Sequence, residues 1–154
     1  DRVGSTAAIS TVAIVVLGTG MGIGRWYGGL DLKNLPLDNQ LLAIIALQFL
    51  GFLGFWLSHN MVISLLCLLV VGLGISMQFA LSSIRLIGLS DGRPDLAIGR
   101  ASLAAGVAIA GAPFLLGLLG DSFGISRAYI MVFVLIGVAF IIVKAIPSEV
   151  KESV

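Results

Sequence analysis

The stretch that decides the fold is residues 39–84, NQLLAIIALQFLGFLGFWLSHNMVISLLCLLVVGLGISMQFALSSI, which contain no charged residue. A helix that crosses a bilayer needs about 20 mostly apolar residues, so this stretch is long enough for two such helices. The polar residues of LSHNM, residues 57–61, predict a turn that divides the stretch into a hairpin of two spans, residues 41–58 and 61–84. Membrane β-strands would be shorter and would alternate in polarity, so the pattern favours helices.

Three further charge-free runs predict spans at about residues 5–24, 101–120 and 128–146. The whole chain of 154 residues is 58% hydrophobic and 11% charged, with a mean hydropathy of +1.12. Soluble domains carry about 25% charged residues, so a soluble protein is excluded. The sequence therefore predicts an all-α, polytopic membrane helix bundle of five transmembrane helices, forming one transmembrane domain over residues 1–154.

The basic residues predict the orientation of the spans. Loops on the inner side of a membrane carry an excess of Lys and Arg. Seven of the nine basic residues fall on one side of the predicted topology: Arg25, Lys33, Arg85, Arg93, Arg100, Lys144 and Lys151. We therefore expect a multi-pass protein of the cell (inner or plasma) membrane, with the N-terminus of this segment outside and its C-terminus cytoplasmic. The chain begins without Met, which we interpret as a sign of a longer protein.

Glycines crowd the end of the first span, in GTGMGIGRWYGG, residues 18–29. Their spacing does not match the dinucleotide fingerprint, and no Gly-Lys-Ser or Gly-Lys-Thr follows to make a P-loop. In a helix, Gly18 and Gly22 form one stripe of small residues and Gly20 and Gly24 another. Such stripes allow close helix packing in membranes, so we expect the first span to press against a neighbour.

Small residues also line two other spans. They lie at Gly72, Ser76 and Ala80 of the third span and at Ala104, Ala108 and Ala112 of the fourth. We expect both spans to have close neighbours. The second span, residues 41–58, carries large Leu, Ile and Phe side chains, so we expect it to face lipid and its Gln48 to be peripheral. On that interpretation, Gln78→Ala should impair function more than Gln48→Ala.

The fourth span and its exit read AGVAIAGAPFLLGLLGDSFG, residues 105–124. This stretch resembles the eleventh helix of major facilitator superfamily transporters, in which a small-residue helix carries a central Pro and ends in Gly-x-x-x-Asp-x-x-Gly. The matching positions here are Pro113, Gly117, Gly120, Asp121 and Gly124. We expect a kink at Pro113, because proline frees a backbone carbonyl one turn earlier, and we expect Asp121 to cap or pin the outer end of the helix.

The end of the first span, GIGRWYGGLD, is similar to the eighth helix of that family where it enters its cytoplasmic loop. Arg25, Gly28, Gly29 and Asp31 occupy the family positions, with Asp31 about one residue early. The chain then corresponds to helices eight to twelve, the C-terminal part of a twelve-helix protein whose N-terminal helices are its partner. The gating or conformational candidates are Arg25, Gly28, Gly29, Asp31, Pro113 and Asp121.

The resemblance implies a secondary active transporter that moves a small solute by alternating access. Its third span would match the tenth helix, which lines the central cavity. Gln78, Ser82 and Arg85 share one helix face there. The substrate-cavity candidates are Gln78, Ser76, Ser82, Thr19 and Thr11.

The remaining chemistry of the sequence argues against an enzyme. All eight acidic residues lie in predicted loops or tails, so no carboxylate is placed inside a span as a proton relay. No nucleophile has a base nearby, and we expect no metal, no cofactor and no nucleic-acid partner; the expected partners are membrane lipid and a small-molecule substrate. The alternative is a non-transporting helical membrane scaffold or assembly subunit. A third possibility, a drug transporter with a five-helix repeat, is disfavoured by the fourth-span motif.

Overall fold

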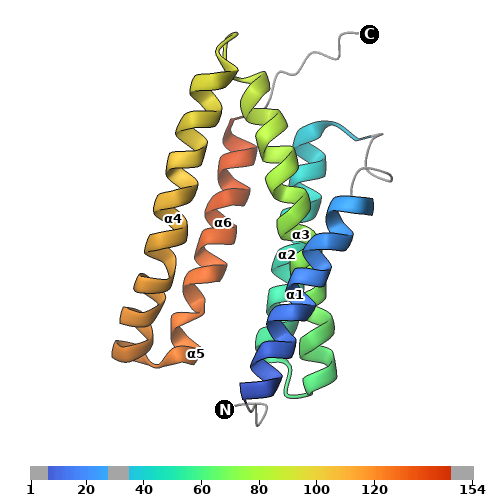
Figure 1. Cartoon of the computed structure of the whole chain (residues 1–154), viewed down its shortest axis with the longest axis vertical. Helices are drawn as coiled ribbons and strands as arrows, with labels where there is room; N and C mark the ends of the chain where they lie inside the picture. The colour runs from blue at the N-terminus through green and yellow to red at the C-terminus, as the bar shows by residue number, and fades with distance from the viewer. Residues whose placement is uncertain (1–6, 28–34, 147–154) are drawn as a thin grey trace. The chain divides into compact units, whose positions relative to one another are not determined.

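The computed structural model describes residues 7–27 and 35–146, and every regular element in these ranges is an α-helix (Figure 1). The helices are α1 Ala7–Tyr27, α2 Leu37–Leu57, α3 Met61–Gly88, α4 Pro94–Phe123, α5 Ile125–Ala128 and α6 Ile130–Ala145. The predicted all-helical architecture is thus confirmed.

Four helical stretches of the described chain are long and apolar enough to cross a membrane: Leu37–Leu57, Met61–Gly88, Pro94–Phe123 and Ile125–Ala145. They support a membrane-embedded protein. In α1 the apolar part, Thr11–Trp26, is shorter. A fifth span and the orientation of the chain therefore stay predictions.

The predicted turn of the hairpin is confirmed between α2 and α3. The Ser58 hydroxyl oxygen accepts a hydrogen bond from the Asn60 amide at 3.1 Å, and Asn60 Oδ1 accepts one from the Val62 amide at 2.9 Å. The second bond satisfies an amide at the start of α3 that has no partner within the helix. Local polar side chains therefore stop one helix and start the next.

Two helices run past the ends of their charge-free runs. α3 continues to Gly88, and α4 begins at Pro94, several residues before the predicted start at residue 101. Proline is favoured at a first helical position, because its missing amide would have no partner there in any case. Hydropathy marks the part of a helix suited to lipid, and the helix itself can extend further.

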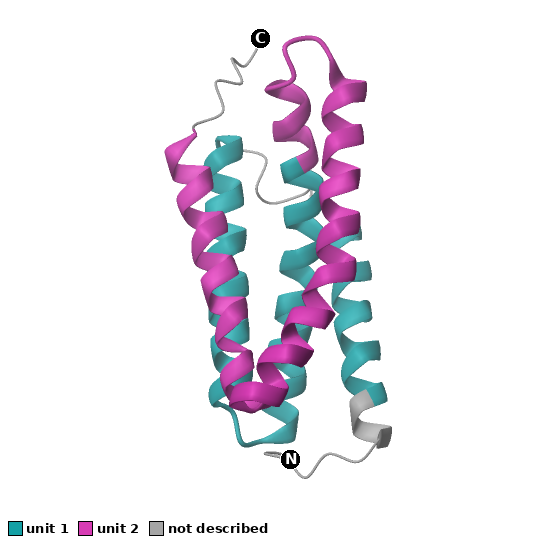
Figure 2. Cartoon of the chain, turned by 90° about the vertical axis from the view of Figure 1, so that its left-hand side faces the viewer, with its two compact units in different colours: residues 1–82 teal, residues 83–154 magenta. Residues whose placement is uncertain are grey.

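The chain divides into two compact units, residues 1–82 and 83–154 (Figure 2). In the first unit, α3 uses two different faces to contact its neighbours. A Cβ at Gly72 would meet α1, and a Cβ at Gly74 would meet Gln48 of α2. Gly20 of α1 lies beside Leu69 of α3, and Gly24, one turn later in α1, lies beside Leu73, one turn later in α3. The two helices are therefore parallel.

The buried side of α2 supplies most of the core of the first unit. Its buried residues are Leu41, Ile44, Ile45, Gln48, Gly51 and Phe52. They recur at the spacing of one helix face. The expectation of a peripheral Gln48 is therefore wrong, whereas large apolar side chains such as Leu47 and Leu50 remain exposed on α2. Every face of α2 is apolar, so large side chains do not distinguish a lipid-facing helix from a core helix.

The second unit contains the last residues of α3 and all of α4, α5 and α6. α4 and α6 run in opposite directions and are joined at one end through the four-residue α5 (Figures 1 and 2). Gly124 makes the corner with a φ of +84°, a conformation that favours glycine, and its amide donates to the Gly120 carbonyl oxygen at 2.9 Å. This backbone bond closes the end of α4, and the predicted capping or pinning by Asp121 stays a prediction.

The predicted close packing of the fourth span is not found. α4 has no buried residue in the described structure. A Cβ added at Gly99, Gly106, Gly111 or Gly117 would meet no atom within 4 Å. A small residue permits a close approach but does not by itself specify one.

Candidate functional site

Gly20, Gly24 and Gly72 form what we call the glycine seam, where the backbones of α1 and α3 meet. A Cβ at Gly20 would clash with the Leu69 carbonyl oxygen, and a Cβ at Gly72 would clash with that of Leu17. At Gly24 the added atom would lie 2.8 Å from the Leu73 carbonyl oxygen. The predicted close neighbour of the first span is therefore α3, and these contacts leave no room for any larger residue.

Only one of the two predicted glycine stripes serves this packing. A Cβ at Gly18 or Gly22 would meet nothing within 4 Å, so the second stripe of α1 has no neighbour in the described structure. The sequence showed two equivalent stripes. The partner helix, which the spacing does not reveal, decides which stripe is used.

Ser76, a cavity candidate, lies at the glycine seam. Its side chain is only 5% exposed, and its Cβ lies 3.2 Å from where a Cβ of Gly24 would be. Its hydroxyl has no hydrogen-bond partner in the described structure. The Ser76 hydroxyl therefore sits inside a helix interface.

The other cavity candidates lie in different surroundings. Gln78 is half-buried, whereas Ser82, Thr19 and Thr11 are exposed. The Thr19 hydroxyl donates to the Val15 carbonyl oxygen of its own helix at 2.8 Å. Such a bond satisfies the hydroxyl locally, as is common for Thr in apolar helices. The five residues thus differ in burial, and their role in a substrate cavity stays a prediction.

Sequence reasoning missed two further buried polar residues, Gln48 and Ser64, each 6% exposed. A Cβ at Gly74 would meet the Gln48 side chain, so the amide lies against α3. Gln48 Nε2 and the Ser64 hydroxyl lack hydrogen-bond partners in the part of the chain that the structure describes. The signal for Gln48 was its amide in a charge-free run, because a polar side chain in a membrane helix usually turns toward protein.

Pro113 and Asp121, two of the conformational candidates, line one open hollow of about 390 Å³ in the second unit. The other residues around it are Leu116, Gly117, Gly120, Ile125 and Tyr129. Asp121 is exposed there. Gly117 is four positions before Asp121 and Pro113 is eight positions before it, so one face of α4 presents all three to the hollow.

The remaining conformational candidates lie at or beyond the end of α1. Arg25 is exposed in the last turn of α1, where a cation interacts favourably with the helix dipole. Gly28, Gly29 and Asp31 lie outside the described residues. The predicted loop motif is therefore represented in the structure by Arg25 and its neighbours in α1.

Arg85 has a structural role that its sequence position did not reveal. Its guanidinium donates to the Ile146 carbonyl oxygen and, at 3.5 Å, to the Val143 carbonyl oxygen. Carbonyls at the end of a helix have no partner within it, and a cation there is favourable. We call this pair of bonds the Arg85 clasp; it joins the end of α3 to the end of α6.

No group of three or more His, Cys, Asp or Glu side chains that could hold a metal occurs among the residues the structure describes. Comparison of the chain with protein-family models, curated proteins and solved structures finds no match. Arguments about function therefore start from the helices, their buried polar atoms and their charges.

Proposed function

We propose that the chain is the C-terminal portion of a secondary active transporter of the major facilitator type, which moves a small solute across a membrane by alternating access. One observation carries the proposal. Three polar atoms are buried without partners inside long apolar helices: Gln48 Nε2, the Ser64 hydroxyl and the Ser76 hydroxyl. Polar side chains are costly within a membrane and commonly mark substrate pathways.

The free-energy cost of burying these three polar atoms links them to a change of conformation. An unsatisfied buried polar group costs about 1–3 kcal/mol. A second arrangement of the helices, or a bound solute, could supply the missing partners and so be stabilised relative to this arrangement. Transport by alternating access needs two such arrangements of similar free energy. The glycine seam supports this mechanism, since backbones in contact can shift without moving large side chains.

The test is uptake by the full-length protein in proteoliposomes, with a panel of weakly polar solutes. Gln48→Met and Ser76→Ala each remove one buried polar group and nearly keep its volume, so both should lower the uptake rate at matched protein level. Ser102→Ala is the control, because Ser102 is exposed on α4. Uptake that is unchanged in both variants would contradict the proposal.

A non-transporting scaffold is the second candidate, and one observation favours it. Ser76 and Gln48 lie in helix interfaces, and three of the five predicted cavity residues, Ser82, Thr19 and Thr11, are exposed. In a scaffold these polar groups would serve helix association alone. A deletion of the gene that leaves solute uptake intact would favour this candidate over the transporter.

A further inference from the structure

The turn between α3 and α4 opens onto a hollow of about 510 Å³ that lies within the second unit. Its apolar lining comes from both helices, with Leu86 before the turn, Leu89 in it and Leu96 after it. Arg93 and Arg100 supply its cationic lining. We call this feature the arginine hollow. It combines an apolar wall with two exposed guanidinium groups.

The arginine hollow lies where the apolar parts of two helices end. The charge-free run of α3 ends at Ile84, and that of α4 starts at Ala101. The part of α4 between Pro94 and Arg100 therefore extends beyond its apolar run by about 10 Å at 1.5 Å per residue. The polar headgroup layer on each side of a bilayer is about 5–8 Å thick. In a membrane these first turns of α4 would cross the headgroup layer.

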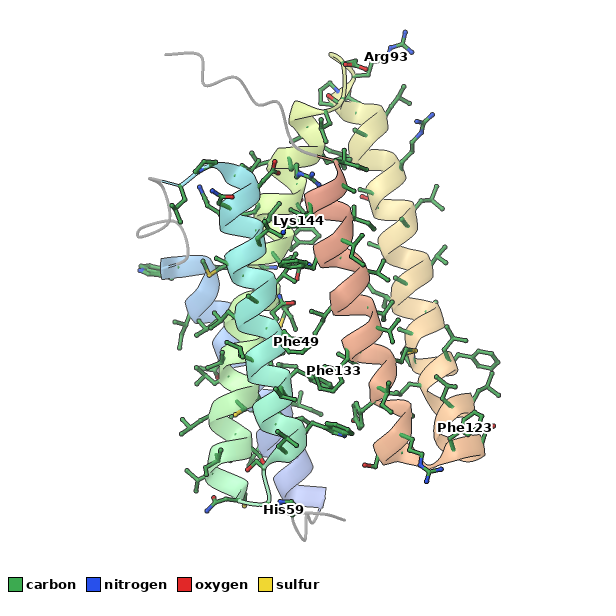
Figure 3. The ribbon with its side chains drawn as sticks, turned by 180° about the vertical axis from the view of Figure 1, so that it is seen from behind. Phe49, His59, Arg93, Phe123, Phe133 and Lys144 are labelled. Atoms are coloured by element: carbon green, nitrogen blue, oxygen red, sulfur yellow. The ribbon has the colours of Figure 1, made fainter. Side chains whose placement is uncertain are left out.

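The charges around the arginine hollow favour an anion. Its lining includes two arginines and one carboxylate, Asp91. Asp95 lies in the first turn of α4, where its carboxylate interacts with the positive end of the helix dipole. That carboxylate reduces the attraction of the helix N-terminus for another anion. The two arginines therefore have to supply the attraction. Guanidinium groups bind phosphate oxygens with paired hydrogen bonds. The Arg93 side chain extends away from the helix ends (Figure 3).

We propose that the arginine hollow binds an anionic phospholipid. Arg93 and Arg100 hold the headgroup phosphate, and the acyl chains lie against Leu86, Leu89 and Leu96. Basic pockets between membrane helices bind acidic headgroups by the same combination of charge and apolar contact. This proposal needs only that α3 and α4 cross a membrane, and it does not depend on transport.

The test uses the full chain reconstituted in vesicles of equimolar phosphatidylglycerol and phosphatidylcholine, followed by native mass spectrometry of the lipids that remain bound. The unaltered chain should retain phosphatidylglycerol in preference to phosphatidylcholine. Each basic residue near a surface contributes roughly a fivefold effect on acidic-lipid binding, so the double variant Arg93→Gln/Arg100→Gln should weaken retention about 30-fold. The matched control is Arg25→Gln/Arg127→Gln, which removes the same charge elsewhere and should weaken retention far less than the double variant at the arginine hollow.

A third variant tests the apolar wall. Leu96→Gln should weaken phosphatidylglycerol retention while leaving competition by inorganic phosphate unchanged. Helical content, measured by circular dichroism, verifies that each variant is folded. Equal retention of the two lipids by the unaltered chain, or equal losses in the double variant and its control, would overturn the proposal. Full displacement of the lipid by inorganic phosphate, with no effect of Leu96→Gln, would also overturn it in favour of a site for the free anion.

Discussion

Gly20 lies in the glycine seam, where a single added methyl group has nowhere to go. Gly20→Ala would push a Cβ into the Leu69 carbonyl oxygen, which belongs to the backbone of α3 and cannot rotate away. Overpacking should lower the free energy of unfolding by about 1–3 kcal/mol. The better helix propensity of Ala should offset up to about 1 kcal/mol of that loss. Thermal unfolding in detergent would measure the loss.

Gly18 and Gly22 provide matched controls on the same helix. An added Cβ at either would meet no atom within 4 Å, so Gly18→Ala and Gly22→Ala should be neutral or slightly stabilising. Equal destabilisation by all three substitutions would contradict the glycine seam and would point to a general need for glycine in α1.

Gln48 carries a different prediction, because its buried Nε2 has no hydrogen-bond partner in the described structure. Gln48→Met keeps the length of the side chain and removes the polar atoms. The folded protein should gain roughly 1 kcal/mol, since an unsatisfied buried group is costly. A higher midpoint of thermal unfolding in detergent would agree with this expectation.

A lower midpoint for Gln48→Met would mean that Gln48 Nε2 has a partner in the intact protein. Gln40→Met is a useful comparison on the same helix. The Gln40 amide donates to the Leu35 carbonyl oxygen at 2.6 Å, so its loss should be destabilising. The two variants should therefore change stability in opposite directions.

At the scale of the element, α6 depends on the Arg85 clasp for its C-terminal end. Arg85→Gln removes the cation and its bonds to the Val143 and Ile146 carbonyl oxygens. Since such a bond contributes about 1 kcal/mol, we expect the last turn of α6 to fray and its amides to exchange hydrogen roughly fivefold faster. Hydrogen exchange read by mass spectrometry on peptides from residues 140–146 would measure this.

Arg100→Gln is the control for the clasp, because Arg100 lies near the start of α4 and is exposed there. Exchange in α6 should be unchanged in that variant. A change confined to α3 in Arg85→Gln, with α6 unaffected, would contradict the clasp.

The elements could be predicted from the sequence because a charge-free run and a polar turn each have a direct local cause. The hairpin around residues 57–61 is an example, and its turn is closed by side chains within the same few residues. The packing of the elements could not be predicted in the same way. α2 carries large side chains and has six buried residues, whereas α4 carries many small side chains and has no buried residue in the described structure.

The candidate site was less predictable still, and for a related reason. Ser76 and Gln48 are both polar residues in apolar helices. Only the partner helix determines that the Ser76 hydroxyl and Gln48 Nε2 are buried without hydrogen-bond partners. Thr19 has the same kind of side chain as Ser76 and satisfies its hydroxyl within α1. A hydroxyl in an apolar run therefore indicates that a polar atom needs a hydrogen-bond partner. The sequence alone does not tell whether that partner lies in the same helix or elsewhere.

At the scale of the whole molecule, the helices make a prediction about sidedness. α3 has 28 residues and is about 42 Å long, enough to cross a bilayer together with its headgroups. His59 lies in the turn before it and Arg93 in the turn after it, and both are exposed (Figure 3). We therefore expect these two positions on opposite sides of the membrane, with Arg93 inside by the positive-inside rule.

Single cysteines at the two positions test this in a Cys67→Ala background. A membrane-impermeant maleimide should label His59→Cys from outside intact cells and Arg93→Cys only after the membrane is opened. The background substitution is mild, because Cys67 packs against the small residue Gly54. Labelling of both positions from one side would exclude a membrane-crossing α3.

The Arg85 clasp also bears on how the protein is made. Ile146, whose carbonyl oxygen receives the guanidinium, comes 61 residues later in the chain. While the ribosome is still adding those residues, the two carbonyl acceptors of the Arg85 clasp do not yet exist. The two bonds of the Arg85 clasp therefore form only after α6 has been made, and a chain that stops before residue 143 can form neither of them.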